Sequence, residues 1–194
     1  MYAYLGCFTT AHRKARGKGI SVYRVDAASG AWDLIEVFGT LPNPGYVALD
    51  SRCRYLYASH GDGAEVSAYA IDARSGKLKF LNKQPSSGEN APHLIVGPDD
   101  HYVVVANGPG IAAFPINADG SLAPSTDAVV PAGTEGPYKR EQGLGAHPHQ
   151  VLFDPGGRFL VSPDKGVDAI HLYRLDAASG KLAVANAGDP GDPA

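Results

Sequence analysis

Two histidines one residue apart, His147 and His149, flank Pro148 at the start of an apolar run within GLGAHPHQVLFDPGGRF (143–159). A neutral imidazole accepts a proton near pH 7, so His149 suits the part of a general base. His147, His149 and Asp164 also carry side chains of the types that bind zinc, but an H-x-H pair alone is a weak zinc pattern, and we expect no metal site. The plainer alternative is that these histidines hydrogen-bond to backbone carbonyls where a strand begins.

The elements that must position these histidines are short β-strands. The 194 residues include 24 glycines and 15 prolines, and the apolar runs are short and rich in Val, Ile, Tyr and Phe, as in strands and turns. One pattern, an alternating strand that ends in an Asp or Asn turn with glycine, recurs along the chain: VYRVDAASG (22–30), AYAIDARSG (68–76), AFPINADG (113–120) and LYRLDAASG (172–180). The chain is therefore built from repeats.

A second pattern, two strands joined by a tight polar turn, lies between the first ones at 43–59, 91–107 and 147–163. We predict an all-β chain, a partial β-propeller of about 3.5–4 four-stranded blades in an incomplete ring, because a repeat of about 45 residues with four short strands is typical of propeller blades. A β-sandwich also has many short strands, but it does not require both patterns to recur in register. The single domain, 1–194, divides into blade-like units and one insertion: 1–41, 42–87, 88–130, 146–190 and the insertion 131–145.

Antiparallel pairing places the start of the first strand and the end of the second strand of each blade at the same end. The first strand of a blade lines the central channel, so polar residues at its entrance converge on the channel axis, where ligands bind. We expect His12 and His60 to be solvated there. Five of the seven histidines and several other polar residues map to this end: His12, His60, His93, His147, His149, Tyr46, Asn107, Asp164 and Lys165.

Charge and composition exclude some classes of function. The formal net charge is −3 and the basic residues are scattered, which excludes a surface suited to nucleic acid. The one basic cluster, 12–18, is interpreted as a solvated loop, with attraction of an anionic ligand as the alternative. No apolar run reaches the length of a membrane span and no signal peptide is recognised, so we expect a soluble cytoplasmic protein without a membrane partner. Cys7 and Cys53 are expected to be buried, inert thiols.

Several longer motifs follow one another along the chain: YLGCFT (4–9), NPGYVALD (43–50), RYLYASHGDG (54–63), VVVANGPG (103–110) and HPHQVLFDPGGRFLVSPDKGVD (147–168). Together they resemble the seven-bladed lactonase propellers, a family that includes cycloisomerase-type 6-phosphogluconolactonases and 3-carboxy-cis,cis-muconate cyclases. The resemblance implies hydrolysis of a sugar lactone, with 6-phosphogluconolactone as the expected substrate, and no bound cofactor. The expected partner is a small anionic lactone or sugar phosphate.

The resemblance also implies site residues. The histidine of a P-H-x-H-x-V type motif is an active-site residue of the family and corresponds to His149, which we predict to be the catalytic base. Acyl transfer to water also needs hydrogen-bond donors for an oxyanion, and a phosphorylated substrate needs cations, to which Lys139 would also contribute. The predicted substrate-binding residues are His93, Asn107, Arg140, Gln142, His147, Asp164 and Lys165.

Some positions depart from the family pattern. Glu141 stands where the family usually has arginine, Lys165 replaces an apolar residue, and Gly108 stands where a tyrosine is usual. Family members are also about twice as long, and their later blades supply a glutamate and an arginine that face the same channel. We expect the chain to be a fragment of a longer product, with completion of the ring by a second chain as the alternative.

Open propeller edges are expected to allow self-association. Two other functions stay open at this stage. The first is that the chain is a binding or scaffold propeller without catalysis. The second is that it cyclises a muconate-type dicarboxylate. Cationic residues at the channel suit either anionic substrate, so the sequence does not separate the lactonase from the cyclase.

Overall fold

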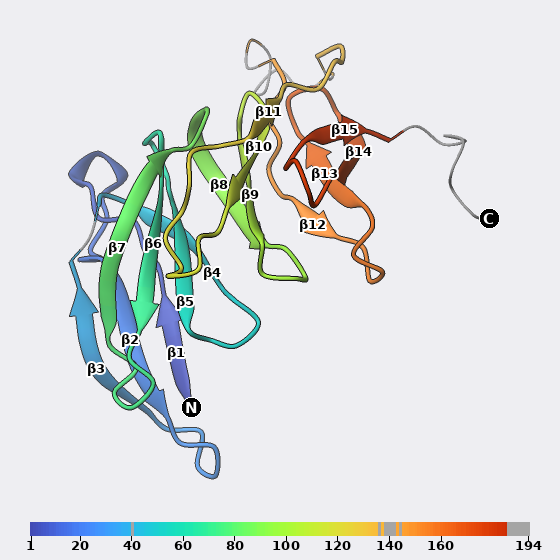
Figure 1. Ribbon diagram of the computed structural model, residues 1–194. Coiled ribbons are helices and arrows are strands. Elements are labelled where there is room, and N and C mark those ends of the chain that lie inside the picture. Colours follow the sequence, from blue (N-terminus) through green and yellow to red (C-terminus); the bar gives the residue numbers. More distant parts are fainter. Residues whose placement is uncertain (40, 136, 138–142, 144, 186–194) are drawn as a thin grey trace.

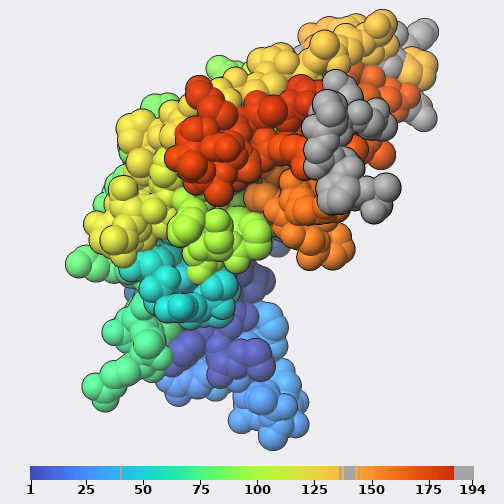
Figure 2. Space-filling view, turned by 45° about the vertical axis from the view of Figure 1, so that its right-hand side comes forward, coloured from blue at the N-terminus to red at the C-terminus, as the bar shows by residue number. Residues whose placement is uncertain are grey.

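The computed structural model describes residues 1–39, 41–135, 137, 143 and 145–185. These residues form four antiparallel β-sheets and one turn of 3-10 helix, η1 (Ala11–Arg13). The sheets follow one another in chain order and stack face to face along an arc (Figure 1). Figure 2 shows the same succession in space-filling form, from the blue first sheet at the bottom to the orange and red fourth sheet. The predicted all-β, partial β-propeller architecture is confirmed.

Each sheet is a meander of consecutive strands. The first sheet contains β1 (Tyr2–Leu5), β2 (Ile20–Val25) and β3 (Trp32–Phe38). The second contains β4 (Pro44–Leu49), β5 (Tyr55–His60), β6 (Glu65–Ile71) and β7 (Leu78–Pro85). The third contains β8 (Glu89–Val96), β9 (Tyr102–Gly108), β10 (Ile111–Pro115) and β11 (Asp127–Val129). The fourth contains β12 (Leu152–Phe153), β13 (Leu160–Asp164), β14 (Ala169–Leu175) and β15 (Leu182–Val184).

We call β4, β8 and β12, the first strands of the four-stranded sheets, the inner strands. Among the described strands, the first sheet has no counterpart of them, because β1 pairs with β2 as β5 pairs with β6. At one end of the sheets the inner strands begin where the second strands end, since Pro44 pairs with His60 and Pro148 bridges to Asp164. The site residues predicted from the repeats therefore gather at this end, which we call the loop end.

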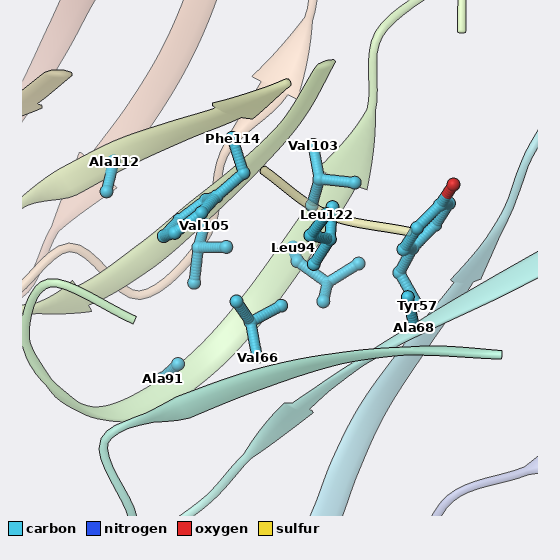
Figure 3. Close-up of a cluster of buried hydrophobic side chains, with 10 residues drawn as sticks. All are labelled: Tyr57, Val66, Ala68, Ala91, Leu94, Val103, Val105, Ala112, Phe114 and Leu122. Carbon is cyan, nitrogen blue, oxygen red and sulfur yellow. The ribbon is translucent and has the colours of Figure 1, made fainter. Parts of the chain in front are cut away.

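The core consists of three layers of side chains, one between each pair of neighbouring sheets. The layer between the second and third sheets contains Tyr57, Leu94 and Phe114 (Figure 3). Strands of the middle sheets are buried on both faces, so Val103 and Val105 of β9 belong to this layer while Val104 faces the fourth sheet. This double burial explains why β9 is a continuous apolar run instead of an alternating one.

The repeated Asp turns also lock neighbouring sheets together. In the turn that follows β2, Asp26 Oδ1 accepts hydrogen bonds from the backbone amides of Ala28 and Ser29, at 2.9 and 2.7 Å. The glycine that ends such a turn lies against a tyrosine of the preceding sheet in the three later sheets. A methyl group added to Gly76, Gly120 or Gly180 would lie within 2.7 Å of a ring atom of Tyr2, Tyr55 or Tyr102, respectively.

Three expectations are corrected by the structure. A strand predicted from Pro148 is reduced to β12, because Pro148 has no N–H and the amide of His147 bonds the Asp164 carboxylate instead of a strand. His60 is buried and not solvated: its ring nitrogens bond Pro42 O at 2.8 Å and Ser67 Oγ at 2.7 Å. The expected burial of both thiols is also wrong, because Cys53 is exposed and Cys7 is half-buried.

Candidate functional site

The inner strands become irregular at the loop end. The pairing of β4 shifts at Gly45, β8 has a register shift between Glu89 and His93, and β12 begins only at Leu152. Such irregularities re-aim side chains and are frequent beside active sites. In this protein they free the entrances of three neighbouring strands from regular pairing.

These strand entrances face one cavity of about 360 Å³. His147 and His149 reach it from the segment before β12, and Lys165 reaches it from the turn after β13. A second hollow, of about 380 Å³, is lined by His149, Asp164, Lys165 and Asp168, so His149 borders both spaces. The described residues that line the first cavity are Phe8, Arg13, Gly45, Gly61, Asn90, Ala91, Pro92, His147, His149 and Lys165.

Tyr46, His93 and His149 each follow a proline closely at the entrance of an inner strand. The Tyr46 and His93 rings are in contact, with centroids 4.1 Å apart and planes inclined at 39°. His93 is 5% exposed, and neither of its ring nitrogens has a hydrogen-bond partner among the described residues. Burial, with a smaller contribution from electrostatic interaction with nearby His149, lowers the pKa of His93 to about 4. His93 is therefore neutral at pH 7 and close enough to His149 for the two rings to interact electrostatically.

Asp164 holds the segment that carries the two histidines. Its Oδ1 atom accepts hydrogen bonds from the backbone amides of His147, Gly166 and Val167, at 2.8, 2.8 and 3.1 Å. The amide of His149 donates to the carbonyl of Pro163 at 3.0 Å. Asp164 is 3% exposed, and its Oδ2 atom has no partner among the described residues. The carboxylate thus positions His147 through the backbone.

The chain matches a family model described as "Lactonase, 7-bladed beta-propeller" over residues 2–190. It belongs to this lactonase family. A relative from Bacillus subtilis named 6-phosphogluconolactonase is 32% identical over 177 residues, which cover 89% of this chain and 48% of the relative. This chain spans about half the length of the curated relatives that it matches.

Solved structures show the same lactonase propeller fold. A crystal structure of a Bacteroides fragilis protein matches with a TM-score of 0.83 and 26% identity, over 95% of this chain and 52% of that protein. The structure described as the periplasmic gluconolactonase of Pseudomonas aeruginosa matches with a TM-score of 0.81 and 27% identity, over 94% of this chain and 53% of that protein.

One departure from the pattern of the lactonase propellers has a local structural explanation. A methyl group added to Gly108 would lie 3.0 Å from Nδ1 and 3.1 Å from Cε1 of His147, so the bare backbone of Gly108 makes room for that ring. A tyrosine, the residue usual at this position, would require His147 to move. The preceding residue, Asn107, is buried and donates from Nδ2 to the carbonyl of Ser86 at 2.8 Å, so this donor already has a partner.

The structure brings three of the predicted lactonase site residues, His147, His149 and Lys165, to the wall of one cavity. His93 and Asp164 lie beside them, whereas Asn107 is not among the residues that line either space. Arg140 and Gln142, together with Lys139 and Glu141, lie outside the described residues.

Sequence reasoning did not place Phe8 and Arg13 in the lactonase site. Both line the same cavity as the histidine segment. The signal for Arg13 was the basic cluster at 12–18, but nothing in its spacing indicated which of its cations would reach the cavity.

Other features carry less information about this lactonase propeller. A hollow of about 500 Å³ at the opposite end, near Asp50 and His101, contains none of the predicted site residues. Within the described part of the chain, no cluster of three or more His, Cys, Asp or Glu side chains is arranged to hold a metal ion. No helix among the described residues has the length and apolar character needed to cross a membrane.

Proposed function

We propose that the protein hydrolyses 6-phosphogluconolactone to 6-phosphogluconate at the loop-end cavity. The observation that carries the proposal is that His149, the predicted base, lines this cavity with His147 and Lys165 in a chain of the lactonase family. The name of the Bacillus subtilis relative supports the choice of substrate. The cytoplasm remains the proposed compartment.

The reaction uses the neutral imidazole of His149 as a general base. It accepts a proton from water while the water oxygen attacks the carbonyl carbon of the lactone. The carbonyl oxygen becomes an oxyanion, and His147 supplies a nearby hydrogen-bond donor for it. The intermediate then collapses and the bond from the carbonyl carbon to the ring oxygen breaks. That oxygen becomes a hydroxyl group by taking the proton that His149 accepted, which restores the base. Lys165 supplies positive charge for the substrate phosphate.

The remaining predicted residues have supporting roles in this proposal. Asp164 fixes the histidine segment, and His93 presents an uncharged ring beside His149. Arg140 and Gln142, which lie outside the described residues, complete the proposed substrate contacts, whereas Asn107 lines neither space and its amide donor is bonded to the carbonyl of Ser86.

The test is a rate measurement with the folded chain. We expect hydrolysis of 6-phosphogluconolactone above its spontaneous rate, and we expect His149→Ala to reduce kcat about 100-fold, the usual scale for loss of a general base. His101→Ala, at an exposed position of the opposite end, is the matched control and should leave the rate unchanged. No acceleration by the folded chain would exclude the lactonase, and an unchanged rate in His149→Ala would remove His149 from the mechanism. Parallel incubation with 3-carboxy-cis,cis-muconate tests cyclisation.

A further inference from the structure

Arg13 is more than a hundred residues from His149 in sequence, yet both line the loop-end cavity. Arg13 enters from the short helix η1, in the basic segment between β1 and β2. Lys165 and the two histidines approach from the fourth sheet. None of the ten described residues that line the cavity is acidic, and two of them carry a permanent positive charge. Such a lining favours an anionic occupant.

The guanidinium group of Arg13 is held in place. Its Nε atom donates to Asp62 Oδ2 at 2.7 Å, and Nη2 donates to Asp62 Oδ1. The guanidinium carbon lies 4.9 Å from the centroid of the Phe8 ring. Among the described residues, the bonds to Asp62 use two of the five N–H donors of the side chain, so three remain to bind another group.

The residues that hold Arg13 are themselves fixed. Asn43 is 1% exposed and donates to Asp62 Oδ2 at 3.1 Å, while its own Oδ1 accepts from the amides of Thr9 and Thr10 at 2.8 and 3.1 Å. One buried side chain thus ties the loop before η1 to the partner of Arg13. The position of the guanidinium is therefore set before any ligand arrives, which lowers the entropy cost of binding.

The Phe8 ring, which contacts the Arg13 guanidinium, packs against the second sheet. A methyl group added to Gly61 would lie 2.6 Å from Phe8 Cε1, and one added to Gly45 would lie 3.6 Å from Phe8 Cζ. The ring therefore lies against two positions of the second sheet that carry no side chain. Packing fixes it under the guanidinium group.

We propose that Arg13 binds the phosphate group of the lactone substrate, opposite the histidines that act at the carbonyl. This inference rests on the proposed function of the same cavity, and it adds Arg13, from the basic cluster at 12–18, to Lys165 as a second cation for the phosphate. The planar guanidinium matches phosphate oxygens in a two-point contact that an ammonium group does not reproduce. Asp62 and Phe8 act as positioning residues, because both contact the guanidinium group of Arg13.

The test compares a charged and an uncharged lactone. With 6-phosphogluconolactone, Arg13→Gln should raise KM about tenfold and change kcat less than about twofold, the scale expected from loss of one charge-assisted contact. With glucono-1,5-lactone, which has no phosphate, the same variant should leave KM unchanged. Arg13→Lys keeps the charge without the planar fork and should raise KM for the phosphorylated lactone about threefold, a partial loss.

Arg16→Gln is the matched control, because it removes the same charge from the same loop at an exposed position outside the cavity lining. It should change KM for neither lactone. Equal increases in KM for 6-phosphogluconolactone in Arg13→Gln and Arg16→Gln would show that the overall positive charge of the loop, and not a direct contact, attracts the phosphate. That result would overturn the proposal. Equal effects of Arg13→Gln on the two lactones would overturn it as well.

A binding measurement separates this inference from the proposed function. The stable acids 6-phosphogluconate and gluconate are titrated into the unmodified chain and into Arg13→Gln by calorimetry. We expect tighter binding of 6-phosphogluconate by the unmodified chain only. If the chain hydrolyses neither lactone but shows this difference, the proposed function fails and the Arg13 site stands. If the chain is active but binds both acids equally, the Arg13 proposal alone is wrong.

Discussion

Three of the predicted site residues keep a buried polar atom without a protein partner among the described residues: the ring nitrogens of His93, Asn107 Oδ1 and Asp164 Oδ2. An unpaired buried polar group costs about 1–3 kcal/mol, so apolar residues would make this region more stable. All three lie at the loop end, where a buried group left unpaired by the protein is available to a ligand.

His93 makes this argument testable. We expect His93→Phe to retain the ring contact with Tyr46 and to raise the free energy of unfolding at pH 7 by about 1 kcal/mol, since no protein hydrogen bond is lost. If His93 contacts substrate, the same variant should raise KM for 6-phosphogluconolactone. Urea denaturation and steady-state kinetics measure the two effects. A more stable variant with unchanged KM would remove His93 from the substrate-binding residues.

The same variant tests the lowered pKa of His93. The pKa is about 4 in the folded chain against an ordinary value of 6.5, so the unfolded chain binds more protons between these two pH values. The stability of the unmodified chain should therefore fall as the pH is lowered from about 6.5 to about 4. His93→Phe should lack this part of the fall. Identical pH dependence of unfolding in the two proteins would contradict the burial argument.

At the scale of elements, the same pentapeptide, DAASG, forms the turn after β2 and the turn after β14. Gly30 and Gly180 both have a φ of 71°, a left-handed conformation that favours glycine. Only their surroundings differ. A methyl group at Gly30 would meet nothing within 4 Å, whereas one at Gly180 would lie 2.3 Å from Thr126 Oγ1 and 2.7 Å from the Tyr102 ring.

This matched pair separates backbone strain from packing between sheets. We expect Gly30→Ala to lower the free energy of unfolding by about 1 kcal/mol, the cost of a left-handed alanine. Gly180→Ala should lower it by about 2–4 kcal/mol, because overpacking against the third sheet adds to the same strain. Urea denaturation measures both values. Equal losses would mean that the contact between turn and tyrosine does not hold neighbouring sheets together.

Repetition made the elements predictable, because each pattern in the sequence corresponds to one hairpin. The repeated pattern at 172–180, for example, corresponds to the end of β14 and the turn that follows it. Single side chains were harder to place. His60 looked solvated beside Gly61 and Asp62, but its ring partners, Pro42 and Ser67, lie on other segments.

Arg13 was missed for a similar reason. Its position depends on Asn43, which bonds Thr9 across 34 residues and so draws the basic loop to the second sheet. Periodicity describes which face of a strand is buried, but it carries no information about such contacts between segments.

At the scale of the whole molecule, the outermost faces of the first and fourth sheets carry exposed apolar side chains. Trp32 and Leu34 of β3 are 52% and 56% exposed, and Ile170 and Leu172 of β14 are 71% and 39% exposed. The corresponding faces of the middle sheets are buried in the core layers. Apolar patches of this kind favour association.

We therefore expect the 194-residue chain to self-associate. Light scattering coupled to gel filtration should give an apparent mass that rises with protein concentration. Ile170→Lys should reduce this rise, because it places a charge on the exposed face of β14. Ala73→Lys adds the same charge in an exposed turn between β6 and β7 and should leave the rise unchanged. A constant monomer mass over the whole concentration range would count against association through these faces.

The walls of the loop-end cavity come from loops and strand entrances of all four sheets. Asn43 fixes the basic loop to the second sheet, and two layers of packed side chains join the second sheet to the fourth sheet, which positions His149. Each layer sets the tilt of one sheet on the next. The separation between Arg13 and His149 therefore depends on the tilt at two successive layers. Phe114 does not line the cavity, but it belongs to the layer between the second and third sheets. A slightly smaller side chain there would change the tilt between these sheets and thereby the separation between Arg13 and His149. Catalytic alignment is in this sense a property of the spacing between sheets.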